Sequence, residues 1–79
     1  MSEVLPQLAE IVHLVTDRPP QEVRPERTFV DELRIDSLAM VEILEGASRH
    51  FDVRIDDEDA KYFVRVGDLV EYVERRLRA

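Results

Sequence analysis

The chain has 79 residues, of which 44% are hydrophobic and 37% charged, with a formal net charge of -7. Residues 1–79 are expected to form one small domain with a modest core, which favours a binding or carrier module over a self-sufficient enzyme. The hydrophobic fraction argues against a disordered chain, and the negative charge argues against nucleic acid as a partner, because phosphate backbones are repelled.

The first predicted element is a helix over about residues 2–16. Its apolar residues recur at helical spacing: Val4, Leu8, Ile11 and Val15, with Leu5 and Val12 beside them. Ser2 is the expected N-cap, and Pro6 is tolerated because it lies in the opening turn. The residues that end the helix include Pro19 and Pro20.

A long connection follows, from residue 17 to about residue 36. Its three prolines keep it extended or turning, and a loop of this length in a small domain is often functional. Alternatively, residues 20–23 or 30–33 form single helical turns. Its apolar side chains are expected to hold it against the helices: Val23, Phe29, Val30, Leu33 and Ile35.

Three more helices are predicted, and no segment shows the pattern of a strand. The second helix begins at Asp36 and Ser37, with Asp36 as its N-cap, and ends near His50. A short third helix covers about residues 57–62, with acidic residues at its start, where the helix dipole favours them. The last helix opens at Asp68. It carries apolar residues on one side and basic residues at its end: Leu69, Val70, Val73 and Leu77, then Arg75, Arg76 and Arg78.

Negative charge is concentrated in the middle of the sequence. Residues 36–59 hold eight acids and two bases, net -6, whereas residues 60–79 hold three acids and five bases, net +2. Such a field attracts basic protein surfaces, although it also serves solubility alone in many proteins. The chain has no cysteine, so any thioester chemistry needs a thiol from outside the sequence. No segment resembles a secretory signal or a membrane span, so a cytoplasmic protein with no membrane partner is the default expectation.

Residues 33–38 form the most informative segment. It places Ser37 at the amino end of a helix, after an acid and before an apolar residue. Helix amino ends offer unpaired N–H groups and partial positive charge, so a phosphodiester on Ser37 would lie in a favourable field. Alternatively, Asp36 and Ser37 are only a helix cap, as most such pairs are.

The ordered set of motifs resembles the acyl carrier protein family over nearly the whole chain. Asp36-Ser37-Leu38 matches the motif that opens the second of the family's four helices. The flanking segments are similar to the family in the same order: residues 28–33, 40–42, 51–53, 55–60 and 66–73.

The resemblance implies an all-α, four-helix bundle of the acyl-carrier type with a long first loop, a short third helix and no catalytic activity of its own. It implies that a phosphopantetheinyl transferase uses coenzyme A to attach 4'-phosphopantetheine covalently to Ser37, beside Asp36 and Leu38. The base comes from the transferase, because no histidine is close in sequence. The thiol at the end of the arm is implied to carry acyl groups as thioesters. The implied partners are acyltransferases, ketosynthases or other acyl-processing enzymes with basic docking patches, and the carrier is expected to be a monomer.

By the same resemblance, the second helix is expected to recognise partners and to help shelter an acyl chain. The candidate partner-binding residues are Leu38, Met40, Val41, Glu42 and Glu45. For Met40 and Val41, core packing is an equally good interpretation. The candidate residues lining an acyl chain are Ile43, Leu44, Ala47, Phe51, Ile55 and Val66, all of which belong to the core in any case.

Three departures from the family pattern fit a carrier for polyketide or other specialised synthesis at least as well as they fit a carrier for fatty-acid synthesis. Arg34 stands where a glycine is common, residues 46–50 are not strongly acidic, and Asp56 stands where a proline is frequent. Two alternatives remain: a peptidyl or aminoacyl carrier, and a helical interaction domain that is never modified.

Two other functions lack their motifs. Residues 52–63 do not fit a calcium-binding EF-hand loop, because the sixth position is Asp57 rather than glycine and the twelfth is Phe63 rather than glutamate. No specific metal site is therefore expected, and only weak divalent binding to the clustered carboxylates is left open. A hydrolase that pairs Ser37 with His13 or His50 would need a Gly-x-Ser-x-Gly elbow, which the sequence does not contain.

Overall fold

The computed structural model describes residues 3–78 and shows a helical bundle. Its elements, in chain order, are α1 (Val4–Thr16), η1 (Pro20–Glu22), α2 (Ser37–Phe51), η2 (Asp57–Tyr62) and α3 (Val66–Arg78). Both η elements are 3-10 helices. The described residues form no strand, only an isolated antiparallel bridge between Thr28 and Arg65. The predicted four-helix fold is confirmed, with η2 as its short third helix.

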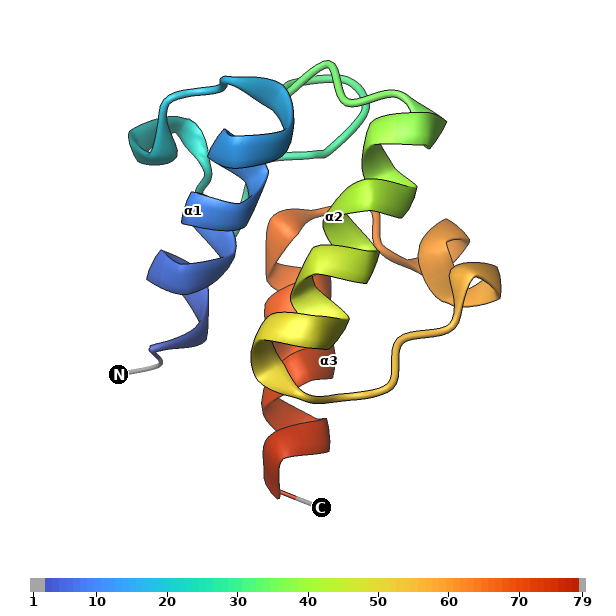
Figure 1. Ribbon diagram of the computed structural model, residues 1–79. Helices are drawn as coiled ribbons and strands as arrows, with labels where there is room; N and C mark the ends of the chain where they lie inside the picture. Colours follow the sequence, from blue (N-terminus) through green and yellow to red (C-terminus); the bar gives the residue numbers. More distant parts are fainter. Residues whose placement is uncertain (1–2, 79) are drawn as a thin grey trace.

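The three α-helices are arranged so that α1 runs opposite to α2 and α3 (Figure 1). The long connection between α1 and α2 crosses one end of the bundle and includes η1. The segment that contains η2 returns the chain from the far end of α2 to the start of α3. None of the described helices combines the length and the hydropathy that a bilayer span requires.

Helix α1 ends where Asp17 adopts a left-handed conformation, with φ 64°, and its backbone N–H donates to the carbonyl of His13. The two prolines that follow prevent the helix from continuing, as predicted. The expected cap, Ser2, lies outside the described residues. The buried stripe of α1 is centred on Leu8 and Val12, and Ile11 lies at its half-buried margin.

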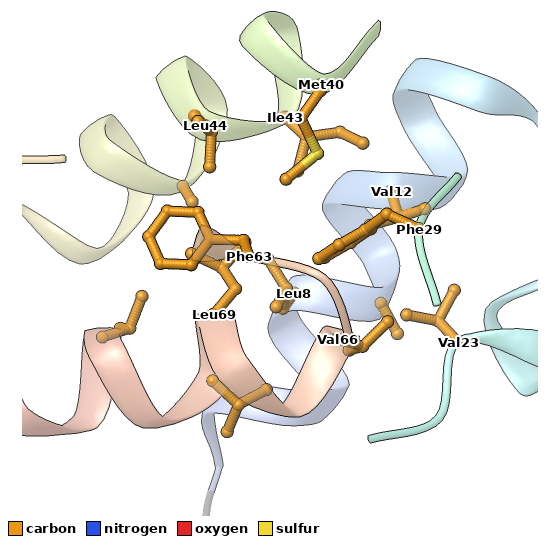
Figure 2. Close-up of a cluster of buried hydrophobic side chains, with 14 of the residues drawn as sticks. Leu8, Val12, Val23, Phe29, Met40, Ile43, Leu44, Phe63, Val66 and Leu69 are labelled. Carbon is orange, nitrogen blue, oxygen red and sulfur yellow. The ribbon is translucent and has the colours of Figure 1, made fainter. Parts of the chain in front are cut away.

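The hydrophobic core joins the long connection to all three α-helices. Figure 2 shows Phe29, from the connection, and Phe63, from the end of η2, among the side chains of this cluster. The buried residues of the connection are Val23, Phe29, Leu33 and Ile35, as predicted. Val30 is 68% exposed, so its predicted packing is wrong. Val30 lies in a non-helical turn that begins at Phe29, and its side chain points away from the core. Because this segment is a turn, the alternative of a helical turn at residues 30–33 is also wrong.

Helix α3 begins at Val66, two residues before the predicted start at Asp68. The carboxylate of Asp68 lies in the first turn and reaches back, where its Oδ2 accepts the backbone N–H groups of Val64 (3.1 Å) and Arg65 (3.0 Å). Asp68 therefore satisfies donors that precede the helix, as the third residue of a capping box does. Leu77, near the other end, is 51% exposed rather than buried.

The long connection also caps α3. The N–H of Val66 donates to the carbonyl of Arg27 at 2.9 Å, and the N–H of Gly67 donates to the carbonyl of Pro25 at 2.9 Å. A Cβ at Gly67 would lie 3.0 Å from the Pro25 carbonyl oxygen, so a larger residue would push the connection away by a few tenths of an ångström, and glycine fits this close approach. These bonds fix the connection against α3 on one side of the bundle.

The connection enters α2 through Arg34, whose φ of 57° lies in the left-handed region. This is the position at which the acyl carrier proteins that the sequence resembles commonly have glycine. A side chain with a Cβ is disfavoured in this conformation, whereas glycine adopts it freely. The departure at Arg34 therefore places backbone strain three residues before Ser37.

Replacing Arg34 by glycine is expected to raise the free energy of unfolding by about 1 kcal/mol, because it removes the left-handed strain. Urea unfolding followed by circular dichroism measures the change. The matched control is Arg34→Ala, which removes the guanidinium but keeps the Cβ and is expected to bring no such gain. Equal stability of the glycine and alanine variants would contradict the assignment of strain to this position.

Candidate functional site

Ser37 is the first residue of α2, and its side chain is exposed. The sequence predicted this position at a junction of loop and helix. Within the described residues, the structure records no hydrogen bond that involves the Ser37 hydroxyl, so the oxygen is open to another molecule.

Asp36 carries out the capping of α2. Its Oδ1 accepts the N–H of Ala39 at 2.8 Å, and its backbone carbonyl accepts the N–H of Met40 at 2.9 Å. With φ -82° and ψ 176°, Asp36 has the extended backbone that is typical of an N-cap. Because Asp36 fills the cap role, Ser37 is not needed for it.

The chain that leads to Ser37 is held by the core and by its own backbone. Leu33 and Ile35 are each 2% exposed, on either side of the exposed Arg34. The N–H of Leu33 donates to the Thr28 carbonyl at 3.1 Å, and that of Ile35 donates to the Phe29 carbonyl at 2.9 Å. These contacts fix the direction in which the chain enters α2.

Thr28 and Glu32 close the turn between them by reciprocal bonds. The N–H of Thr28 donates to Glu32 Oε1 at 2.9 Å, and the N–H of Glu32 donates to the Thr28 hydroxyl at 3.1 Å. The bond from the Thr28 N–H is the main reason why the pKa of the Glu32 carboxyl lies below its usual value. Desolvation opposes this lowering, and the nearby Arg27 guanidinium adds to it. Because its pKa is lowered, the ionised Glu32 carboxylate stabilises the turn at pH values above the ordinary pKa of glutamate. This stabilisation is lost as the pH falls through the lowered pKa.

An open hollow of about 390 Å³ lies beside Ser37. Its lining comes from the connection, α2 and η2: Val30, Ile35, Asp36, Ser37, Met40, Val41, Asp57, Ala60 and Lys61. Most of this lining is apolar, and Lys61 is its one cation and the only lysine of the sequence. Four of these neighbours of Ser37 were not predicted from the sequence: Val30, Asp57, Ala60 and Lys61. The isolated lysine was the one available signal.

The predicted partner-binding residues differ in exposure. Leu38 is 70% exposed, and Glu42 and Glu45 are also exposed. Val41 is half-buried, and Met40 is 9% exposed and belongs to the core cluster. Met40 therefore packs as a core residue whose edge lines the hollow, while Leu38 stands clear of the core beside Ser37.

The predicted acyl-lining residues all belong to the core or pack against it. The buried ones are Ile43, Leu44, Ala47, Ile55 and Val66, and Phe51 is half-buried. None of the six lines the hollow beside Ser37. Their role toward an acyl chain stays a prediction.

The exposed acids of α2 also face a second hollow, of about 530 Å³, between α1 and α2. Its lining includes Glu42, Glu45 and the 73% exposed Leu14. The ion pairs recorded between described residues are Arg18–Glu22, Arg27–Glu32, Arg54–Asp56 and Glu71–Arg75. Glu42 and Glu45 take part in none of these pairs, so their charges are available to a basic surface.

Comparisons with known proteins agree with these features. A family model described as "Phosphopantetheine attachment site" matches residues 6–73. The chain is 45% identical over 71 residues to a protein named "Acyl carrier protein" from Acidothermus cellulolyticus, which covers 90% of this chain and 84% of that protein. It is 47% identical over 73 residues to "Meromycolate extension acyl carrier protein" from Mycolicibacterium aurum, which covers 92% and 75%. A further "Acyl carrier protein", from Thermobifida fusca, is 44% identical over 73 residues and covers 92% of each chain.

Loss of the cap is expected to weaken the start of α2. Asp36→Ala should lower the free energy of unfolding by about 1 kcal/mol, because the Ala39 N–H loses its acceptor, whereas Asp36→Asn keeps an acceptor and most of the stability. Thermal unfolding of the three proteins measures the difference. If the alanine variant were as stable as the asparagine variant, the capping role of Asp36 would be refuted.

Proposed function

Because the chain belongs to the phosphopantetheine-bearing family of acyl carrier proteins, we propose that Ser37 is the residue that carries its 4'-phosphopantetheine. The observation that carries the proposal is the contrast between the described serines. Ser37 is exposed and unbonded at the start of α2. Ser48 is half-buried, and its hydroxyl donates to the Val53 carbonyl at 2.6 Å. Of these two serines, Ser37 is therefore the one whose hydroxyl another protein can reach.

The surroundings of Ser37 fit an arm linked through a phosphodiester. The amino end of α2 provides partial positive charge, which favours a phosphate on its first residue. The adjoining hollow offers apolar surface from Val30 and Val41 and the cation of Lys61. The attached arm supplies the thiol that this cysteine-free chain lacks, so that acyl groups are held as thioesters.

The chain's own residues do not activate the Ser37 hydroxyl. A serine nucleophile needs an adjacent base. Of the two histidines, His13 donates from Nδ1 to the Arg18 carbonyl at 2.9 Å, and His50 Nε2 lies 2.6 Å from the Gln7 side-chain oxygen, near the far end of α2. The base must come from a phosphopantetheinyl transferase, and the carrier has no catalytic activity of its own.

Partner enzymes recognise the surface around the start of α2. Leu38 presents an exposed apolar contact next to Ser37, and Val30 extends this surface onto the connection. The unpaired carboxylates of Glu42 and Glu45 attract basic residues at the entrance of a partner. Charges of this kind mainly accelerate and orient encounters, and they leave dissociation fast. A monomeric carrier that visits several enzymes needs both properties.

The cargo is an acyl chain under synthesis, in a polyketide, fatty-acid or related pathway. The names of the relatives support acyl cargo, and one of them refers to the extension of a meromycolate chain. This supports an acyl carrier over a peptidyl or aminoacyl carrier. The remaining alternative is an interaction domain that keeps the fold but is never modified. A direct test of loading with phosphopantetheine distinguishes it from a carrier.

Incubation with coenzyme A and a promiscuous phosphopantetheinyl transferase is expected to add one phosphopantetheine unit to the wild-type chain. Ser37→Ala should gain none, because it lacks the acceptor oxygen. Intact-mass spectrometry measures both. The matched control is Ser48→Ala, which should be loaded like the wild type. Absence of any mass gain in the wild type would favour the unmodified interaction domain.

Reversal of both α2 acids, Glu42→Lys with Glu45→Lys, is expected to slow acyl transfer from the loaded carrier to a basic acyltransferase about fivefold at low salt, because the encounter loses its attraction. Initial transfer rates at several ionic strengths measure the effect, which should shrink as salt screens the charges.

Glu10→Lys with Glu26→Lys is the control for net charge. Both residues are exposed, and neither lies in α2. This pair of substitutions should leave the transfer rate near that of the wild type. Equal slowing by the two double variants would show that total charge, and not the surface of α2, governs recognition.

A further inference from the structure

A side chain from the end of α1 reaches the turn that leads into α2. The Nε–H of Arg18 donates to the carbonyl of Leu33 at 3.0 Å, in a partly buried position. This carbonyl belongs to the peptide group that joins Leu33 to Arg34. The bond therefore holds the plane of the peptide immediately before the residue with positive φ.

The turn through Arg34 must be held in place by contacts. A residue with a Cβ is disfavoured in the left-handed region relative to glycine, so the backbone at Arg34 leaves this conformation unless neighbouring groups prevent it. Backbone bonds of Leu33 and Ile35 oppose it on both sides of Arg34. Among the described residues, Arg18 is the one side chain recorded as donating to the backbone of residues 33–35.

Arg18 is itself fixed to the end of α1. Its backbone carbonyl accepts from His13 Nδ1 at 2.9 Å, and its N–H donates to the Thr16 hydroxyl at 3.2 Å. Its Nη1 lies 3.8 Å from Glu22 Oε1. The backbone of Arg18 is bonded to α1 and its side chain is bonded to the Leu33 carbonyl. Arg18 therefore links the position of α1 to that of the turn before Ser37.

We propose that Arg18 is a positioning residue for Ser37. Its Nε–H bond to Leu33 braces the strained turn at Arg34 and so keeps the start of α2 in the conformation that a transferase recognises. The brace compensates for the absence of glycine at position 34. The inference rests on the proposed modification of Ser37 and adds to it a residue distant in sequence that governs how well the serine is presented.

The brace acts on recognition rather than on the transfer step. If the turn opens part of the time, the fraction of carrier that a transferase can bind falls, and the apparent KM for the carrier rises in proportion. The bound carrier has the ordered turn in each variant, so kcat is expected to be unchanged. A general loss of stability would not raise KM while leaving kcat unchanged, as long as the chain remains folded.

Two substitutions separate the hydrogen bond from the charge. Arg18→Met keeps much of the side-chain length but has no donor. Arg18→Gln places an amide nitrogen where Nε stands and restores a donor without the charge that faces Glu22. The matched control is Arg24→Met in the same connection, where the exposed Arg24 Nε donates to the Gln21 carbonyl at 3.4 Å.

Loading of the apo chain with coenzyme A by a promiscuous phosphopantetheinyl transferase provides the first measurement. We expect kcat/KM for Arg18→Met to fall about fivefold through KM, because without the Nε donor the turn is open most of the time. Arg18→Gln should lie within about twofold of the wild type, because it restores the donor. Arg24→Met should match the wild type. Normal loading of Arg18→Met, or failure of Arg18→Gln to rescue, would overturn the proposal.

A double-mutant cycle with Arg34→Gly tests the link to the strained turn. With glycine at this position the left-handed conformation carries little strain, so Arg18→Met should cost less than about twofold in that background. A loss as large as in the parent chain would mean that Arg18 does not brace this turn.

Amide hydrogen exchange keeps the test independent of the proposed function. The Ile35 amide, bonded to the Phe29 carbonyl, should exchange at least about fivefold faster in Arg18→Met, whereas the amide of Val73 in α3 should not change. Unchanged exchange at Ile35 would overturn the brace even if no chain were loaded. Absence of loading in the wild type, with faster exchange at Ile35 in the variant, would instead contradict only the modification of Ser37.

Discussion

The burial of Leu33 and Ile35 on either side of an exposed residue fixes how the chain enters α2, and the presentation of Ser37 depends on it. Between these two buried side chains, Arg34 turns the backbone at positive φ. The chain then reaches Asp36 in an extended conformation suited to capping. Because Asp36 binds the Ala39 N–H, the next side chain is released to solvent at the positive end of the helix dipole.

The charged side chains of the described residues include some that bind backbone groups and others that stay exposed and outside the recorded ion pairs. Carboxylates that fix backbone lie at turns, as Glu32 does for Thr28 and Asp68 does for the start of α3. The arginines near the end of α3 oppose the negative end of its dipole. Glu42 and Glu45 are outside the recorded ion pairs and stay exposed on α2. In the proposed function these free carboxylates attract partner enzymes, and each attraction has to form and break once per visit.

The helices and the serine were predictable because they depend on local patterns. Helical spacing and prolines indicated the extent of α1, and the acidic start of η2 marked its bounds. The rest depended on contacts between distant segments. The start of α3 is set partly by loop carbonyls about forty residues away in sequence, as in the bond from Val66 to Arg27. The exposure of Val30 beside the buried Phe29 follows from a turn whose geometry the apolar pattern does not encode.

The central claim, that the arm is attached at Ser37, is tested most directly by locating the modification within one peptide. Trypsin cleaves after Arg34 and Arg49, so the peptide of residues 35–49 contains both Ser37 and Ser48. Fragmentation of this peptide from the loaded chain distinguishes the two serines in a single spectrum. The phosphopantetheine mass should lie on fragments that contain Ser37 and be absent from those that contain only Ser48. Its presence on Ser48, or on a peptide from elsewhere in the chain, would contradict the claim.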